Sequence, residues 1–198
     1  MKRPLWTTLA AVGSILVAAA IILALWNVHT DLRASRSRDT LLVQLAEAMP
    51  EEEPAAPVYE PEPVAEEPEL PSVPIDGRNY MGAIRFPILS LELPVLAEYS
   101  LEALKVAPAV YSGTPEGRDL VICGHNYRAH FGPLVQLQPG DEVLMQCVDG
   151  TVYRYSVSAT EIVSPYAVED VTSGQWDLTL FTCTMGGQSR FVVRCDLI

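Results

Sequence analysis

The stretch LTLFTC, Leu178–Cys183, decides how the C-terminal part of this chain is interpreted. Its leucine, threonine and phenylalanine residues favour extended backbone, so the run is expected to be a strand. The strand stops at Cys183, and the turn-forming residues TMGGQS separate it from a further β-type run that begins at Arg190. A cysteine in this position is a core side chain, half of a disulfide or a nucleophile.

Short β-type runs broken by turns continue through the whole chain from about Gly77. They are GAIRFPI, LSLELPVL, DLVICGHN, DEVLMQCV, VYRYSVSATEIV, LTLFTC and SRFVVRCDLI. Asp149-Gly150 between two alternating runs is a strong hairpin signal, and only SLEALKVA suggests a short helix. So many brief strands predict a mainly β domain, either a barrel or a sandwich.

The N-terminal stretch Leu5–Trp26 contains 22 residues and no charge. A helix of that length spans the roughly 30 Å hydrocarbon core of a bilayer. The stretch exceeds the apolar region of about 7 to 15 residues in a signal peptide, and no convincing cleavage site follows it. We therefore expect an uncleaved, single-pass anchor in the cell membrane. The short tail before it favours a cytoplasmic N-terminus and an extracellular C-terminal domain.

The net charge of −12 is concentrated in one segment of the chain. Residues 47–76 hold ten acidic residues, no basic residue and repeated proline, which predicts a disordered, extended spacer. We expect three parts: the membrane anchor (1–29), a juxtamembrane segment with the Pro/Glu-rich spacer (30–76), and a folded β domain (77–198). Such an acidic chain has little affinity for phosphate backbones, so nucleic acid is not an expected partner.

Three side chains form the candidate catalytic group. His125 ends the run LVICGHN in the same way that Cys183 ends LTLFTC, and Arg190 opens the run after Cys183. If the first two strands are neighbours, their terminal side chains meet at one rim of the sheet. A nearby imidazole and guanidinium would favour the reactive thiolate and stabilise an anionic intermediate.

The remaining cysteines and histidines have less specific interpretations. Cys123, Cys147 and Cys195 lie inside apolar runs and are expected to be core side chains, although a disulfide among them stays open. His130 is expected to be solvated in its loop. A zinc site is disfavoured because no CxxC pair is present.

At these residues the sequence resembles the sortases, the cysteine transpeptidases of Gram-positive cell surfaces. The thiol motif of that family is matched by Thr179-Leu180-Phe181-Thr182-Cys183 with Arg190 after it, and the histidine motif by Gly124-His125-Asn126. The runs MGAIRFPILSLELPVL, YSGTPEGRDLVICGHN and FGPLVQLQPGDEV extend the resemblance over roughly residues 78–198.

The resemblance implies a closed eight-stranded β-barrel with short helices in its connections. It implies that Cys183 is the nucleophile, His125 the general acid and Arg190 the support for substrate or oxyanion, with Thr182 beside the thiol helping to bind the substrate. The implied reaction cleaves an LPxTG-like sorting signal through a thioester on Cys183 and transfers the acyl group to an amine. No metal or organic cofactor is expected.

The implied partners are surface proteins with a C-terminal sorting signal and an acceptor amine, on a cell-wall precursor or a pilin lysine. Two alternatives stay open. One is a cysteine hydrolase or peptidase that uses the same Cys183 and His125, and the other is a tethered barrel that only binds.

Overall fold

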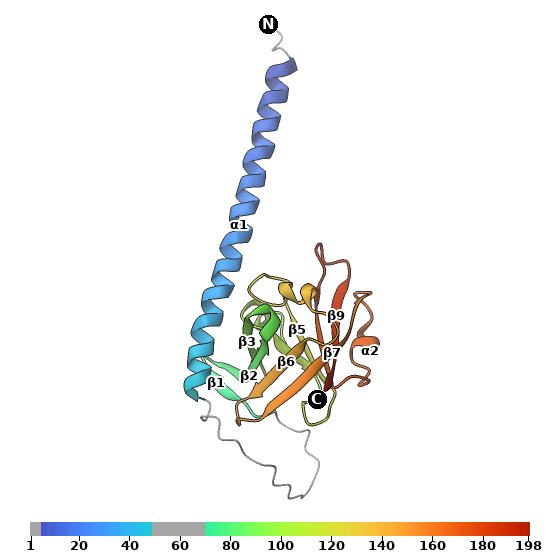
Figure 1. Cartoon of the computed structure of the whole chain (residues 1–198). Helices are drawn as coiled ribbons and strands as arrows, with labels where there is room; N and C mark the ends of the chain where they lie inside the picture. The colour runs from blue at the N-terminus through green and yellow to red at the C-terminus, as the bar shows by residue number, and fades with distance from the viewer. Residues whose placement is uncertain (1–4, 49–69) are drawn as a thin grey trace, which may run out of the picture.

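The computed structural model describes residues 5–48 and 70–198 (Figure 1). Within the first helix, side chains are described for residues 12–26, 28–29 and 38–48. The helices are α1 (Leu5–Ala48) and α2 (Val168–Val171), with 3-10 turns η1 (Pro87–Leu89), η2 (Ala103–Lys105) and η3 (Gly132–Gln136). The strands are β1 (Val73–Ile75), β2 (Arg78–Phe86), β3 (Leu91–Leu96), β4 (Ala109–Ser112), β5 (Leu120–Gly124), β6 (Glu142–Cys147), β7 (Val152–Val163), β8 (Leu178–Cys183) and β9 (Arg190–Leu197).

The strands form one sheet that closes on itself. Its order is β1-β2-β3-β4-β5-β8-β9-β7-β6, and β2 also pairs with β6. This second pairing closes a ring of eight strands, β2 to β9, which confirms the predicted mainly β, eight-stranded barrel with short helices. The short β1 pairs only with the first residues of β2 and begins at Val73, inside the segment predicted as spacer.

Alternation along the strands separates an interior from an outer face. Ile122 of β5 and Leu180 of β8 are fully buried in the main core, together with Phe86 and Phe131, whose rings meet edge to face. The predicted Asp149-Gly150 turn joins β6 to β7, with Gly150 at a φ of 90°, where a residue without Cβ is favoured. Leu120 and Leu178 belong to the same core, whereas Val121, Cys123 and Phe181 alternate with these residues and lie on the outer face, which carries the candidate site.

Two segments outside the ring flank the barrel on opposite sides (Figure 1). Helix α1 runs along one side, where its C-terminal end contacts β1, β2 and β3. Leu41 and Leu45, one turn apart, are buried there in an apolar cluster with Tyr80 and Leu104. On the other side, the connection between β7 and β8 carries α2.

Helix α1 is continuous across the predicted boundary between residues 29 and 30. The sequence contains no proline or glycine between Gly13 and Pro50, so nothing in it interrupts the helix. Among the residues described, no helix is both long enough and apolar enough to cross a membrane. Most of the predicted Pro/Glu-rich spacer, residues 49–69, lies outside the described residues.

Candidate active site

Strands β5 and β8 are parallel neighbours, and they end together. Gly124 pairs with Thr182 in the ladder, so His125 and Cys183 follow at the same level. The expectation that the strands ending at His125 and Cys183 lie side by side is therefore confirmed. Both side chains line the same pocket.

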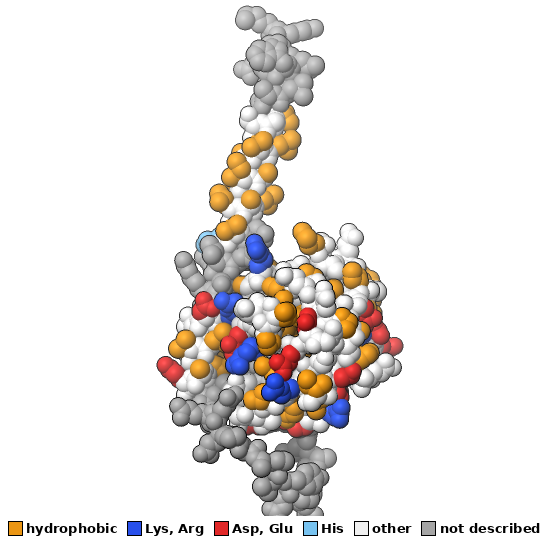
Figure 2. Space-filling view, in the orientation of Figure 1, with side chains coloured by type: hydrophobic (Ala, Val, Ile, Leu, Met, Phe, Trp, Pro, Cys, Tyr) orange, Lys and Arg blue, Asp and Glu red, His pale blue; other side chains and the backbone are white. Residues whose placement is uncertain are grey.

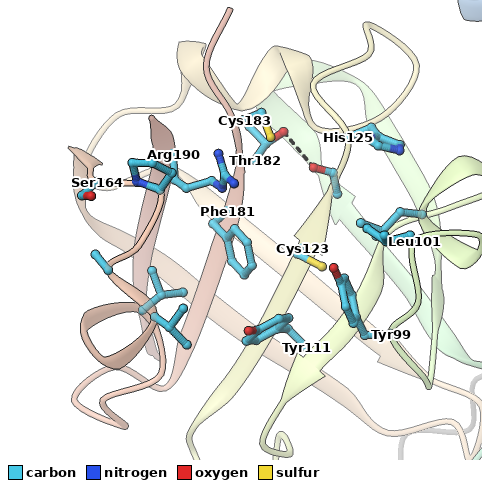
Figure 3. A pocket seen from close by; sticks show the side chains of 16 residues that line it. Tyr99, Leu101, Tyr111, Cys123, His125, Ser164, Phe181, Thr182, Cys183 and Arg190 are labelled. Carbon is cyan, nitrogen blue, oxygen red and sulfur yellow. Dashed lines mark hydrogen bonds between the residues drawn. The ribbon is translucent and has the colours of Figure 1, made fainter. Parts of the chain in front are cut away.

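Arg190 joins the pair from the third strand. It opposes Cys183 in the antiparallel ladder between β8 and β9, and Figure 3 shows its side chain directed toward Thr182 and Cys183. Its Nη1 donates to the carbonyl oxygens of Gly187 (3.3 Å) and Ser189 (3.2 Å). Both bonds use the same nitrogen. Among the described residues Nε and Nη2 have no partner, so these donors are available to a substrate oxygen.

Two hydrogen bonds hold the ends of β5 and β8 together. The hydroxyl of Thr182 donates to the carbonyl oxygen of Gly124 (2.8 Å), and Asn126 Nδ2 donates to the carbonyl oxygen of Thr184 (3.3 Å). Thr182 is buried, and its only hydroxyl proton is used in this bond. The structure therefore gives Thr182 a role in aligning the two strands, and its contribution to substrate binding remains a prediction.

A pocket of about 250 Å³ opens over these three side chains (Figure 3). Its floor is formed by Cys123 of β5, His125 directly after β5, Phe181 and Cys183 of β8, and Arg190 of β9. Residues two apart in a strand share a face, which explains why Cys123 and Phe181 continue the floor below the candidate catalytic group. The structure thus brings His125, Cys183 and Arg190 into the lining of one pocket.

Two walls rise from this floor. The α1-side wall consists of Tyr99, Leu101, Leu104 and Tyr111, from the residues between β3 and β5. The α2-side wall is the segment 164–171, which contributes Ser164, Pro165, Ala167, Val168 and Val171. Edge-to-face contacts from Tyr99 to Tyr111 (5.2 Å) and from Tyr111 to Phe181 (5.4 Å) connect the α1-side wall to the floor. The lining is therefore mostly apolar, and the guanidinium of Arg190 is its one permanent charge.

The imidazole of His125 packs against Tyr127, with ring centroids 4.8 Å apart. Figure 3 shows the ring turned away from Cys183, and no hydrogen bond joins these two described side chains. Partial burial lowers the pKa of His125, and the positive charge of Lys105 lowers it further. The imidazole is therefore mainly neutral at pH 7 in the free protein.

The prediction that His130 is a solvated loop residue is wrong. His130 is 1% exposed, and neither ring nitrogen has a hydrogen-bond partner among the described residues. The next residue, Phe131, is fully buried in the core, and the backbone amide of His130 bonds to the carbonyl of Tyr127 (3.0 Å). The tight turn around Phe131 therefore draws His130 inward. Burial lowers its pKa to about 4.

The other three cysteines are free thiols in buried positions, as expected of core side chains. Burial raises the pKa of Cys123 and of Cys147 to about 12, and it raises the pKa of Cys195 further. Cys183 is the one cysteine that is not buried. Within residues 5–48 and 70–198, no cluster of three or more histidine, cysteine, aspartate or glutamate residues could hold a metal ion.

Sequence reasoning missed most of the pocket lining. Strand alternation could have placed Cys123 with His125 and Phe181 with Cys183, because each pair is two residues apart. The two walls come from connections between strands, and no periodic pattern predicts their path. The buried Arg194, which bonds to Asp170 of α2, was also missed.

The chain is similar to known proteins of one family. The family model of the Sortase domain matches residues 84–198. Sortase A of Bacillus anthracis is 29% identical over 138 residues, which cover 66% of this chain and 65% of that relative.

Solved structures share the fold. Sortase A from Corynebacterium diphtheriae superimposes with a TM-score of 0.56 at 24% identity, covering 61% of each chain. Sortase C1 from Streptococcus agalactiae gives a TM-score of 0.54 at 27% identity, over 63% of this chain and 70% of that one. This chain spans less than two thirds of the length of the Bacillus anthracis and Corynebacterium diphtheriae proteins that it matches.

Proposed function

The chain belongs to the sortase family, whose members are generally cysteine transpeptidases, and from this premise we propose that it cleaves and transfers LPxTG-like sorting signals. The observation that carries the proposal is the convergence of Cys183, His125 and Arg190 on one pocket floor. His125 directly follows β5, Cys183 is the last residue of β8, and Arg190 is the first residue of β9. The hydrogen bonds of the sheet therefore fix their backbone positions before substrate arrives. Such preorganisation is what nucleophilic catalysis requires.

The reacting form is the fraction of the protein in which Cys183 is a thiolate and His125 is protonated. In the first step, the sulfur of this thiolate attacks the carbonyl carbon of the scissile threonine–glycine bond. Negative charge develops on the carbonyl oxygen, and the free donors of Arg190 stabilise it. The bond to the leaving nitrogen breaks while protonated His125 gives its proton to that nitrogen. The products are a thioester on Cys183 and the released C-terminal fragment.

In the second step, an acceptor amine attacks the thioester carbon. Neutral His125 removes the proton of the amine, and the carbon–sulfur bond breaks to regenerate the thiolate of Cys183. A new amide joins the threonine to the acceptor, which is a cell-wall precursor or a pilin lysine. The substrate amide lies between sulfur and imidazole in this scheme, so no direct hydrogen bond between Cys183 and His125 is needed in the free protein. The chemistry requires no cofactor.

The shape of the pocket supports a peptide substrate with apolar residues. The aromatic floor and the α1-side wall form a slot below Cys183, where apolar side chains ahead of the scissile bond would be buried. We propose that the partners are surface proteins with a C-terminal sorting signal.

We also propose that the protein is a single-pass protein of the cell membrane, with its N-terminus in the cytoplasm and the barrel outside. The support is the uncharged stretch Leu5–Trp26 and the exposed apolar side chains along the described part of α1 (Figure 2). Fractionation of cells and protease treatment of whole cells test this. Recovery of the full chain in the soluble fraction would contradict it.

The activity is tested by incubating the full chain in detergent with an LPxTG peptide, with and without an amine such as triglycine. We expect an amide product that appears only with the amine, and loss of all activity in Cys183→Ala without loss of folding. Cleavage that gives the same hydrolysis product with and without the amine would instead identify a hydrolase. Binding of the peptide without cleavage would identify a binding protein.

A further inference from the structure

We propose that Arg194 and Asp170 act as a latch that holds the α2-side wall over the active site, and that both are positioning residues for substrate binding. This inference rests on the proposed function, because it concerns how the same pocket receives its peptide. Arg194 is a buried arginine on β9 that the proposed reaction does not use.

Arg194 is 2% exposed, although arginine is almost never fully buried without partners. Its Nε donates to Glu161 Oε1 (2.7 Å), its Nη2 to Asp170 Oδ2 (3.3 Å), and its Nη1 to Thr179 Oγ1 (3.3 Å). A buried guanidinium is costly unless charged and polar partners satisfy it in this way. One cation is therefore shared by two carboxylates and a hydroxyl.

The three partners of Arg194 differ in how their backbone is anchored. Thr179 opposes Arg194 in the ladder between β8 and β9, and Glu161 lies on β7, which also pairs with β9. Both are therefore already fixed by backbone hydrogen bonds of the sheet. Asp170 lies on α2, which belongs to no strand ladder. The bond to Asp170 is consequently the polar side-chain tie between the sheet and α2.

The latch connects to the active site through the outer face of β9. Arg190, Val192 and Arg194 alternate along this strand and share that face. Val192 packs with Val121 and with Val171 of α2 in a small apolar cluster. Arg190 thus lies at the pocket end of this row of side chains, and Val192 with its valine cluster lies in the middle. The bond between Arg194 and Asp170 lies at the far end.

The helix itself is too short to hold its place alone. Helix α2 has four residues, and its amides bond only to nearby carbonyls, from Val171 to Ala167 (3.2 Å) and from Thr172 to Val168 (3.0 Å). An isolated turn of this kind is unstable in water. Val168 and Val171 line the pocket, so release of Asp170 loosens the surface against which the peptide packs. The reacting groups on the floor would be unaffected.

The test compares Asp170→Asn with Glu169→Gln in the full chain. The two changes remove the same charge from neighbouring positions of α2, but no described bond joins Glu169 to Arg194. For Asp170→Asn we expect the KM for the LPxTG peptide to rise about three- to fivefold, the effect of losing a partly exposed ion pair, with kcat changed less than twofold. Glu169→Gln should leave both constants unchanged, and Asp170→Glu should restore most of the KM.

Hydrogen exchange measured by mass spectrometry provides a readout that needs no activity. Amides of residues 168–172 should exchange about three- to fivefold faster in Asp170→Asn than in wild type, and at the wild-type rate in Glu169→Gln. If the chain turned over no peptide while this exchange difference appeared, the proposed function would fail and the latch would stand. Unchanged exchange and unchanged KM in an active Asp170→Asn enzyme would overturn the latch.

Discussion

The two walls of the pocket are fastened to the same barrel by different forces. The α1-side wall is backed by apolar packing, in which Leu104 shares a cluster with Leu41 and Leu45 of α1. The α2-side wall has a smaller apolar contact and an ion pair whose carboxylate, Asp170, is 57% exposed. Apolar burial is not weakened by ionic screening, whereas a partly exposed ion pair is. The site therefore has one firmly packed wall and one that responds to ionic conditions.

The largest predicted effect concerns the packed wall. Leu45 is 1% exposed, and replacing it with alanine removes its contacts with the barrel. Core Leu→Ala changes cost about 2 to 5 kcal/mol, so Leu45→Ala should lower the free energy of unfolding of the full chain by an amount in that range. Urea unfolding followed by circular dichroism measures it.

Val43→Ala is the matched control, because Val43 lies on the same helix and is 61% exposed. We expect the control to stay within about 0.5 kcal/mol of wild type. Equal and small effects of both changes would show that α1 does not pack on the barrel as described, and the contrast between the walls would disappear.

The second prediction concerns a pH-sensitive group beneath the packed wall. Burial lowers the pKa of His130 to about 4, with further lowering by the charges of His125 and Arg38, against an opposing contribution from the carbonyl of Val106. The folded state therefore prefers neutral His130, and stability falls as the pH drops from about 6.5, the unfolded value, through about 4. The loss amounts to roughly 3 kcal/mol.

Unfolding curves for wild type and His130→Leu across this pH range isolate the contribution of His130. As the pH falls, the free energy of unfolding should decrease less for His130→Leu than for wild type. Parallel curves would mean that His130 is accessible to water and that this side of the pocket is packed less tightly than described.

The third prediction concerns the floor between the walls. Arg190→Lys replaces a planar fork of donors with a single ammonium group, so we expect kcat/KM for the peptide to fall about 100-fold, or about 3 kcal/mol of transition-state stabilisation. Both walls should stay in place, with unchanged hydrogen exchange at residues 168–172. Turnover by the lysine variant near the wild-type rate would assign the oxyanion to another donor.

The smallest effect concerns a charge on the packed side. Lys105, in η2, lowers the pKa of His125 after the larger effect of burial. Lys105→Met should raise that pKa, so the limb of the kcat/KM profile that reports the ionisation of His125 should move to higher pH by roughly a few tenths of a unit. A shift in the opposite direction would contradict the assignment of His125 as the general acid.

The sequence alone predicted the elements that depend on short-range pattern. Strand alternation and the Asp149-Gly150 turn indicated a barrel, and equivalent strand ends predicted that His125 and Cys183 would be neighbours. Burial of His130 could not be predicted in this way, since it depends on Phe131 entering the core from a loop. The latch of Arg194 depends on Glu161 and Asp170, which are 33 and 24 residues away in the sequence.

The continuity of α1 from Leu5 to Ala48 was also not predicted. The change from apolar to charged residues after Trp26 suggested a boundary, but helix continuity depends on the absence of proline and glycine, and the docking of Leu41 and Leu45 depends on the surface of the barrel. Such tertiary contacts carry no local pattern beyond a one-turn spacing of leucines.

The most direct test of the whole account is the mass of the enzyme trapped with an LPxTG peptide in the absence of an amine. We expect an added mass equal to the acyl fragment, located on Cys183 by peptide mapping, released by hydroxylamine and absent in Cys183→Ala. Peptide cleavage without an adduct on Cys183, or an adduct that persists in the alanine variant, would show that the reaction proceeds elsewhere.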